Sequence, residues 1–168
     1  MPTAKLHLTH KRGLEKTMRN LSISLCFLAL LTSAGTTLAV DLPVKTDSSY
    51  VSPTSVSGAT TVDAAKAHEL WKQRAWFIDP RKPGQYEAGR IPGALNIEYD
   101  PGTPDQQLTA ESLAAEVAKD EPVVFYCNAA GCDRSSWGAA LAVEWGWQAV
   151  YYFRDGFPAW SKAGYPVE

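Results

Sequence analysis

Hydrophobic and polar positions follow a regular pattern only from about Thr61 onward. Residues 40–60 are rich in Ser, Thr, Pro and Asp and show neither helical nor strand periodicity, so we expect a flexible leader that lies on the surface or is partly disordered. Beyond the leader, short apolar runs predict buried strands at residues 75–79, 92–97, 122–126 and 149–153. Amphipathic segments predict helices at residues 61–73, 109–120, 135–146 and 157–164.

Hydroxyl side chains stand where two of these helices are expected to begin. Thr61 is the expected N-cap of the first helix, and Thr109 is the expected N-cap of the second. In the second helix we expect the inner face to consist of Leu113, Ala114 and Val117.

The alternation of strands and helices predicts the fold. Over residues 61–168 it indicates one three-layer α/β/α domain in which helices cover both faces of a parallel sheet. Ligands of such sheets bind beyond the carboxyl ends of the strands, near the N-termini of helices. Cys127 lies at such a place, because it directly follows the apolar strand at residues 122–126.

Residues 1–39 have the order of an export signal. A positively charged start leads into an apolar run at residues 21–31, and small residues follow up to Ala39. The run is shorter than the ~20 residues that a membrane-spanning helix needs, although an N-terminal anchor helix is the alternative interpretation. Met18 is an alternative start, since the signal reads more naturally from it. We therefore expect a periplasmic or secreted protein with no membrane contact after signal cleavage.

Composition and charge narrow the class of partner. The chain of 168 residues is 45 % hydrophobic and 20 % charged, which suits one soluble globular domain. Its formal charge is −2, and cleavage of the predicted signal, which is rich in Lys and Arg, leaves a more acidic protein. This balance argues against nucleic acid and anionic membrane surfaces as partners.

Cleavage after Ala39 would remove Cys26 and leave Cys127 and Cys132. An oxidising compartment permits a disulfide between them. A bridge between cysteines five positions apart closes only a small loop and contributes little to stability, so a purely structural role explains the pair poorly.

The loop after Cys127 has the properties of an anion-binding loop. Its backbone N–H groups and the dipole of the following helix would stabilise a thiolate, and the small residues Ala129, Ala130 and Gly131 allow the backbone to approach a ligand closely. Arg134 could add donors for an oxyanion such as thiosulfate or phosphate. The pattern predicts a nucleophilic cysteine, and the alternative is a small apolar core residue.

Two signatures and this loop make residues 56–168 resemble the rhodanese-like sulfurtransferase family. The first signature, "FIDPRKPGQYEAGRIPGALNI", matches the family at Asp79, Arg81, Gly89, Ile91, Pro92, Gly93, Ala94 and Asn96. The closing signature, "VYYFRDGFPAWSKAGYPVE", matches it at Gly156, Trp160, Gly164, Pro166 and Val167. The strand "VVFYC" matches the entry to the family's catalytic cysteine.

The resemblance implies a rhodanese-like α/β/α fold with a central parallel sheet of about five strands. It implies that Cys127 accepts sulfane sulfur from a small anionic donor, holds it as a persulfide, and passes it to a thiol or to cyanide. Asp79 and Arg81 would brace the loop, or form a purely structural ion pair. Neither a metal nor an organic cofactor is implied. The backbone that would bind the persulfide and the donor belongs to Asn128, Ala129, Ala130, Gly131, Cys132, Asp133, Arg134 and Ser135.

The loop departs from the common family pattern in its length. Sulfurtransferases commonly have four residues between the cysteine and the Arg, phosphatases of the same fold have five, and this chain has six. It is similar to a subgroup with an extended CN-x-x-x-C-x-R-S loop, although Ala129 replaces that subgroup's glycine. The longer loop leaves specificity for thiosulfate open, and Asp133 adds a negative charge that opposes thiolate stabilisation.

Three other functions compete with sulfur transfer. In a thiol–disulfide redox protein, Cys127 would attack and Cys132 would resolve, with a redox partner protein. Cys132 could also discharge the persulfide by forming the disulfide, or merely fill the loop. A non-catalytic binding or sulfur-sensing module is the next interpretation. A phosphatase ranks lower, because the loop length and Asp133 fit a phosphate loop poorly.

Overall fold

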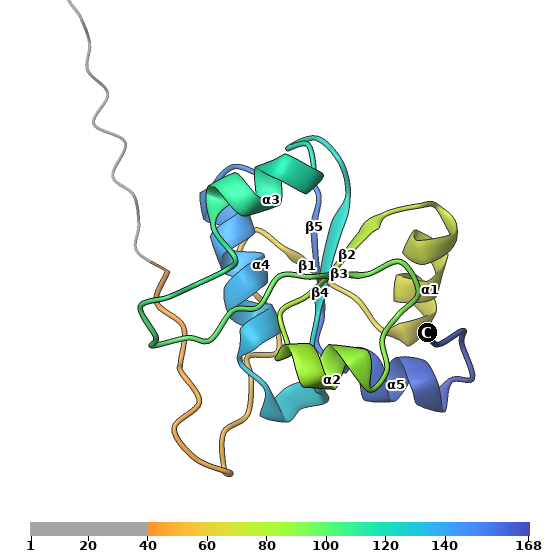
Figure 1. The fold of residues 1–168 in the computed structure, drawn as a ribbon, viewed down its shortest axis with the longest axis horizontal. Helices are drawn as coiled ribbons and strands as arrows, with labels where there is room; N and C mark the ends of the chain where they lie inside the picture. Colours follow the sequence, from red (N-terminus) through yellow and green to blue (C-terminus); the bar gives the residue numbers. More distant parts are fainter. Residues whose placement is uncertain (1–39) are drawn as a thin grey trace, which may run out of the picture. The chain divides into compact units, whose positions relative to one another are not determined.

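The computed structural model of the chain describes residues 40–168 (Figure 1). The predicted export signal lies outside the described residues and stays a prediction. Five parallel strands form one sheet in the order β1-β5-β4-β2-β3. The strands are β1 (Thr60–Thr61), β2 (Trp76–Asp79), β3 (Leu95–Asn96), β4 (Val123–Tyr126) and β5 (Val150–Phe153). The helices are α1 (Ala64–Lys72), α2 (Pro83–Glu87), α3 (Ala110–Glu116), η1 (Ala129–Gly131, a 3-10 turn), α4 (Arg134–Glu144) and α5 (Gly156–Lys162).

Helices cover both faces of the sheet, as Figure 1 shows. One apolar cluster joins the sheet to α3 and α4, and a second joins it to α1 and α5. In the central strand β4, Val123 and Phe125 belong to the first cluster, and Val124 and Tyr126 belong to the second. All four are fully buried, which explains the continuous apolar run of this strand. The predicted α/β/α fold with a five-stranded parallel sheet is confirmed.

The beginning of the domain differs from the expectation. Thr61 does not cap the first helix, because Thr60 and Thr61 pair with Tyr151 and Tyr152 and form the edge strand β1. The helix α1 begins later, behind Asp63, whose carboxylate accepts the N–H of Lys66 at 2.8 Å. The polar sequence of β1 gave no apolar signal for a strand.

The helix α3 confirms its cap and corrects its inner face. Thr109 accepts the N–H of Ser112 at 3.1 Å, and the Ser112 hydroxyl accepts the N–H of Thr109 at 2.9 Å, so the pair forms a capping box. The prediction that Ala114 faces inward is wrong, since this residue is exposed. Leu113 and Val117 occupy the buried stripe, because residues four apart share one face of a helix.

No helix within residues 40–168 combines the length and the apolar character needed to cross a membrane.

Candidate active site

The main chain of Cys127 is fixed at the carboxyl end of β4. Its carbonyl oxygen accepts the N–H of Phe157 at 2.9 Å, in the first turn of α5. Gly156 lies so close that a Cβ atom at that position would clash with the same oxygen. Gly156 also has a φ of 57°, which glycine adopts without strain. The closing signature of the sequence therefore packs directly against the predicted nucleophile.

A disulfide joins Cys127 to Cys132, with their Cα atoms 6.3 Å apart. Residues 129–131 between them form the turn η1, and the N–H of Cys132 donates to the carbonyl of Ala129 at 3.1 Å. Cys127 is 0 % exposed, whereas Cys132 is half-buried and lines a pocket. In this oxidised form Cys127 has no free thiolate, so nucleophilic attack by this residue requires that the disulfide first be opened.

Asp79 and Arg81 form a buried ion pair next to the loop that follows Cys127. The Arg81 guanidinium donates to Asp79 at 2.6 Å and 2.8 Å and reaches the loop itself through Asn128, whose Oδ1 accepts from Nη1 at 3.2 Å. Burial alone would lower the pKa of Arg81, but the hydrogen bond and charge of Asp79 raise it above its ordinary value. The ion pair is thus buried and also contacts the loop through Asn128, and its role in bracing the loop stays a prediction.

Tyr126 packs against this ion pair. The Arg81 guanidinium lies 5.6 Å from the centre of the Tyr126 ring and 4.9 Å from that of Phe157. Burial, followed by the charge of Asp79, strongly raises the pKa of the Tyr126 hydroxyl, so this hydroxyl remains neutral. It accepts the N–H of Ile91 at 3.3 Å. The two family signatures and the cysteine strand therefore meet in one buried cluster.

Arg134 holds a neighbouring segment. Its guanidinium donates to the carbonyl of Tyr99 at 2.8 Å and pairs with Asp100 at 2.7 Å, with a longer contact of 3.4 Å to Glu98. The Nη1 atom, which donates to Tyr99, also donates to the carbonyl of Pro80 at 3.3 Å. These groups engage Nη1 and Nη2, and the role of Arg134 as an oxyanion ligand stays a prediction.

Asp133 is buried at the N-terminus of α4, yet its side chain does not cap that helix. Its carboxylate instead accepts the backbone N–H of Lys45 at 2.6 Å. The Ser135 hydroxyl, also buried, has no hydrogen-bond partner among the described residues. The first-turn N–H groups of α4 therefore lack a side-chain cap.

The leader lies against this loop, a contact that no sequence pattern indicated. The Lys45 ammonium donates to the carbonyl of Gly131 at 2.7 Å, and the N–H of Ser52 donates to the carbonyl of Ala130 at 2.7 Å. The indole of Trp137 donates to the carbonyl of Pro43 at 3.4 Å. Residues 43–52 thus follow the outside of the loop as a strap.

A pocket of about 580 Å³ opens beside Cys132. It is lined by Lys45, Lys82, Gln85, Asp100, Pro101, Asn128, Gly131, Cys132, Asp133 and Arg134. The loop residues were predicted for the site, whereas the two lysines come from the leader and from the residue before α2. Sequence patterns could not select them, because lysines on irregular segments are usually solvated surface residues.

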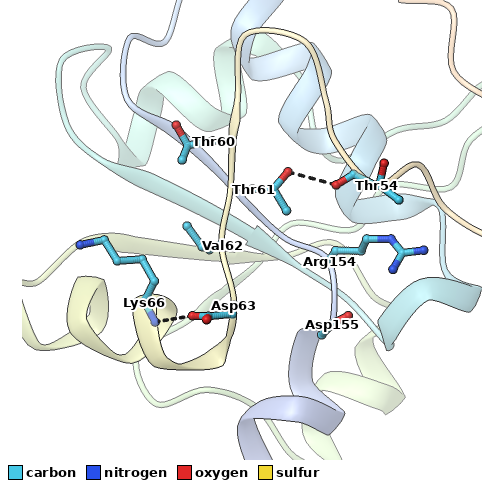
Figure 2. A pocket seen from close by; sticks show the side chains of 8 residues that line it. All are labelled: Thr54, Thr60, Thr61, Val62, Asp63, Lys66, Arg154 and Asp155. Carbon is cyan, nitrogen blue, oxygen red and sulfur yellow. Dashed lines mark hydrogen bonds between the residues drawn. The ribbon is translucent and has the colours of Figure 1, made fainter.

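A second pocket, of about 540 Å³, lies where β1 and the end of β5 meet the leader (Figure 2). Arg154 lines it and donates to the carbonyl oxygens of Ser52 at 3.0 Å and Pro53 at 3.1 Å. The Thr61 hydroxyl donates to the carbonyl of Thr54 at 3.3 Å (Figure 2). These polar groups hold the leader, and none of the residues lining this pocket belongs to the loop at 127–135.

Comparison with known proteins agrees with this arrangement. The sequence model of the family described as Rhodanese-like domain matches residues 61–163. The chain belongs to the rhodanese-like domain family. Membership of the subgroup with the extended loop stays a prediction.

Two curated relatives share part of the sequence. Rhodanese-like domain-containing protein 14, chloroplastic, from Arabidopsis thaliana is 27 % identical over 144 residues, which cover 64 % of each chain. The HTH-type transcriptional regulator Rv0324 from Mycobacterium tuberculosis is 34 % identical over 110 residues, which cover 63 % of this chain and 45 % of the regulator. The match thus spans less than two-thirds of either relative.

Solved structures share the fold. The BH2092 protein from Bacillus halodurans superimposes with a TM-score of 0.56 at 21 % identity, covering 66 % of this chain and 77 % of the other. RPA3614 from Rhodopseudomonas palustris, described as a protein of unknown function and possible tyrosine phosphatase, gives 0.51 at 30 % identity, covering 67 % and 86 %.

Proposed function

We propose that the protein is an exported, periplasmic or secreted sulfurtransferase that carries sulfane sulfur on Cys127. The observation that carries the proposal is the position of Cys127 between the end of β4 and the uncapped N-terminus of α4. Free N–H groups and the positive end of a helix favour an anion at this place, which is what a thiolate or persulfide requires.

The reaction needs two displacements. The Cys127 thiolate attacks the outer sulfur of a donor such as thiosulfate, an S–S bond forms on Cys127, and the S–S bond of the donor breaks to release sulfite. A thiol or cyanide then attacks the outer sulfur of the persulfide, and the Cys127 thiolate leaves. Each step moves one sulfane sulfur and needs no further oxidant or reductant.

The disulfide supports a second function, that of a thiol–disulfide redox protein. Cys127 would be the attacking thiolate, and Cys132 would resolve the mixed disulfide by forming the bond seen in the structure. An oxidising compartment permits this bond, and export would bring the protein into such a compartment. The two functions differ in whether Cys132 is required.

Mass spectrometry on the reduced protein tests the first function. After incubation with thiosulfate, we expect one added sulfur atom on Cys127 in the wild type and no such adduct in Cys127→Ser. If no adduct forms with thiosulfate or with other sulfane donors, the first function is wrong, and the redox protein and the non-catalytic binding module are the interpretations that remain.

The variant Cys132→Ser separates the two functions. Sulfur transfer through Cys127 alone predicts that this variant, once reduced, forms the persulfide and transfers its sulfur at a rate similar to that of the reduced wild type. A redox protein predicts instead that the variant remains trapped in mixed disulfides with its oxidant. Both results can be read from intact masses.

A further inference from the structure

The two cysteines of the disulfide differ in accessibility. Cys127 is 0 % exposed and does not line the pocket, whereas Cys132 is half-buried and does. Thiol–disulfide exchange requires a thiolate to contact the sulfur that it attacks. A reductant that enters the pocket therefore meets Cys132.

The pocket carries positive charge that protein carboxylates do not neutralise. The ammonium of Lys45 contacts the neutral carbonyl of Gly131, and that of Lys82 forms no ion pair within residues 40–168. Both lysine residues are exposed, so their ammonium groups are available to a ligand.

The lysines outnumber the acidic charge that remains unpaired in the pocket. Asp100 pairs with Arg134 at 2.7 Å, whereas Asp133 accepts only the backbone N–H of Lys45 at 2.6 Å, which leaves its formal charge unpaired. The charged lining residues are Lys45, Lys82 and Arg134 against Asp100 and Asp133, which leaves a formal charge of +1, so the entrance to Cys132 attracts anions. At about 580 Å³ the pocket has the size of a site for a small molecule.

We propose that this pocket binds small thiols that carry a carboxylate, and that such a thiol opens the disulfide by attacking Cys132. Lys45 and Lys82 bind the carboxylate and bring the thiolate to Sγ of the half-buried Cys132. A redox partner protein is the competing reductant. The inference rests on the proposed function in one respect, since the freed Cys127 is the residue that carries sulfur there.

The exchange balances in two steps. The small thiolate attacks Sγ of Cys132, a mixed disulfide forms, and Cys127 leaves as a thiolate. A second small thiolate attacks the sulfur of the first, which releases a small-molecule disulfide and the Cys132 thiolate. Two small thiols are oxidised and the protein disulfide is reduced.

Reduction rates with thiols of different charge test the proposal. The oxidised protein, beginning at Val40, is mixed with 3-mercaptopropionate, 2-mercaptoethanol or cysteamine at equal thiolate concentration, and its free cysteines are alkylated and counted by mass spectrometry. The rate ratio of the anionic to the cationic thiol is compared between wild type, Lys82→Gln, Lys45→Gln and the control Lys72→Gln. Ratios between proteins cancel the intrinsic reactivity of each thiol.

We expect the ratio of the anionic to the cationic thiol to fall about threefold in Lys82→Gln and in Lys45→Gln and to stay unchanged in Lys72→Gln. In the wild type the ratio should also fall in high salt, because salt screens the lysine charges. Lys72 ends α1 and does not line this pocket. A ratio that is the same in all four proteins would overturn the proposal, and a redox protein would then be the better reductant.

The site of attack is tested by acid quenching of the wild type early in the reaction with 3-mercaptopropionate. Peptide mapping should find the mixed disulfide on Cys132, and a mixed disulfide on Cys127 would contradict the proposal. Neither readout depends on sulfur transfer. Loss of persulfide formation on the pre-reduced protein would therefore overturn the proposed function while leaving the charge dependence intact.

Discussion

Cys127 is positioned through its main chain. The carbonyl oxygen receives the N–H of Phe157, and Gly156 leaves room for that approach. The side chain, by contrast, changes partners whenever the disulfide opens. A cysteine whose bonding partner changes needs such a fixed backbone if its sulfur is to return to the same place.

The substitution Gly156→Ala should displace the cysteine strand from α5. The control Gly164→Ala shares the left-handed backbone, with φ of 74° against 57°, but has open space at the Cβ position. Both variants lose about 1–2 kcal/mol to backbone strain, and Gly156→Ala loses a further 1–3 kcal/mol to the clash. Urea unfolding measures the difference, and equal losses would contradict the close approach.

The substitution Asn128→Ala asks whether Arg81 braces the loop. It removes the acceptor at 3.2 Å and leaves the Asp79–Arg81 pair intact. We expect a stability loss of about 1 kcal/mol together with slower persulfide formation on the reduced protein. If the ion pair is purely structural, the persulfide rate equals that of the wild type.

The residues of the site differ in how far the sequence could predict them. Cys127 was predicted because it follows an apolar strand and precedes a helix, and the structure places it there. Lys45 and Lys82 could not be predicted, because their positions beside Cys132 result from the fold and not from any local pattern. The contacts of the two Nη groups of Arg134 have the same origin, since their partners Tyr99 and Asp100 lie on a distant irregular segment.

The strap and the helix α4 are the elements that surround the loop. Three backbone or side-chain hydrogen bonds join residues 45–52 to the loop residues Ala130, Gly131 and Asp133. A protein that begins at Val51 would lack two of these bonds. We expect faster hydrogen exchange at the amides of residues 131–137 in that protein and no change in β4, because β4 is covered by other elements. Unchanged exchange would show that the loop holds its structure without the strap.

The same glycine-to-alanine change should have opposite effects in two helices. In α4 a Cβ atom at Gly138 would lie 2.7 Å from the ring of Phe125, whereas at Gly84 in α2 it would meet nothing within 4 Å. We expect Gly138→Ala to cost about 1–3 kcal/mol and Gly84→Ala to stabilise by about 0.5–1 kcal/mol. Thermal unfolding of both variants checks the sign.

Elements with a strong local pattern could be predicted from the sequence. Elements that form only by pairing with a distant segment, or that are very short, could not. The strand β4 was predicted from its apolar run and the helix α3 from its N-cap, and both are present. β1 was missed because Thr60 and Thr61 are polar and become a strand only through their bonds to β5. The helix α2 was not predicted either, since five residues beginning at Pro83 carry too short a pattern.

The whole domain should fold with or without its disulfide. The bridge closes a loop of few residues, so chain entropy assigns it at most about 2 kcal/mol, whereas two apolar clusters hold the sheet. Reduction should leave the circular dichroism spectrum unchanged and lower the melting temperature by only a few degrees. Unfolding on reduction would mean that the bond is a structural staple after all.

The order of strands in the sheet has a consequence for synthesis. β1 leaves the ribosome first among the strands, yet its neighbour in the sheet is β5, the last strand to be made, with Thr60 beside Tyr151. The hydrogen bond that Phe157 donates to the carbonyl of Cys127 likewise cannot form until Phe157 has been synthesised. Both cysteines are therefore synthesised, and both thiols are exposed to solvent, before α5 can pack against Cys127. Any oxidant present during this interval can reach both thiols, and Cys127 becomes fully buried only in the folded domain.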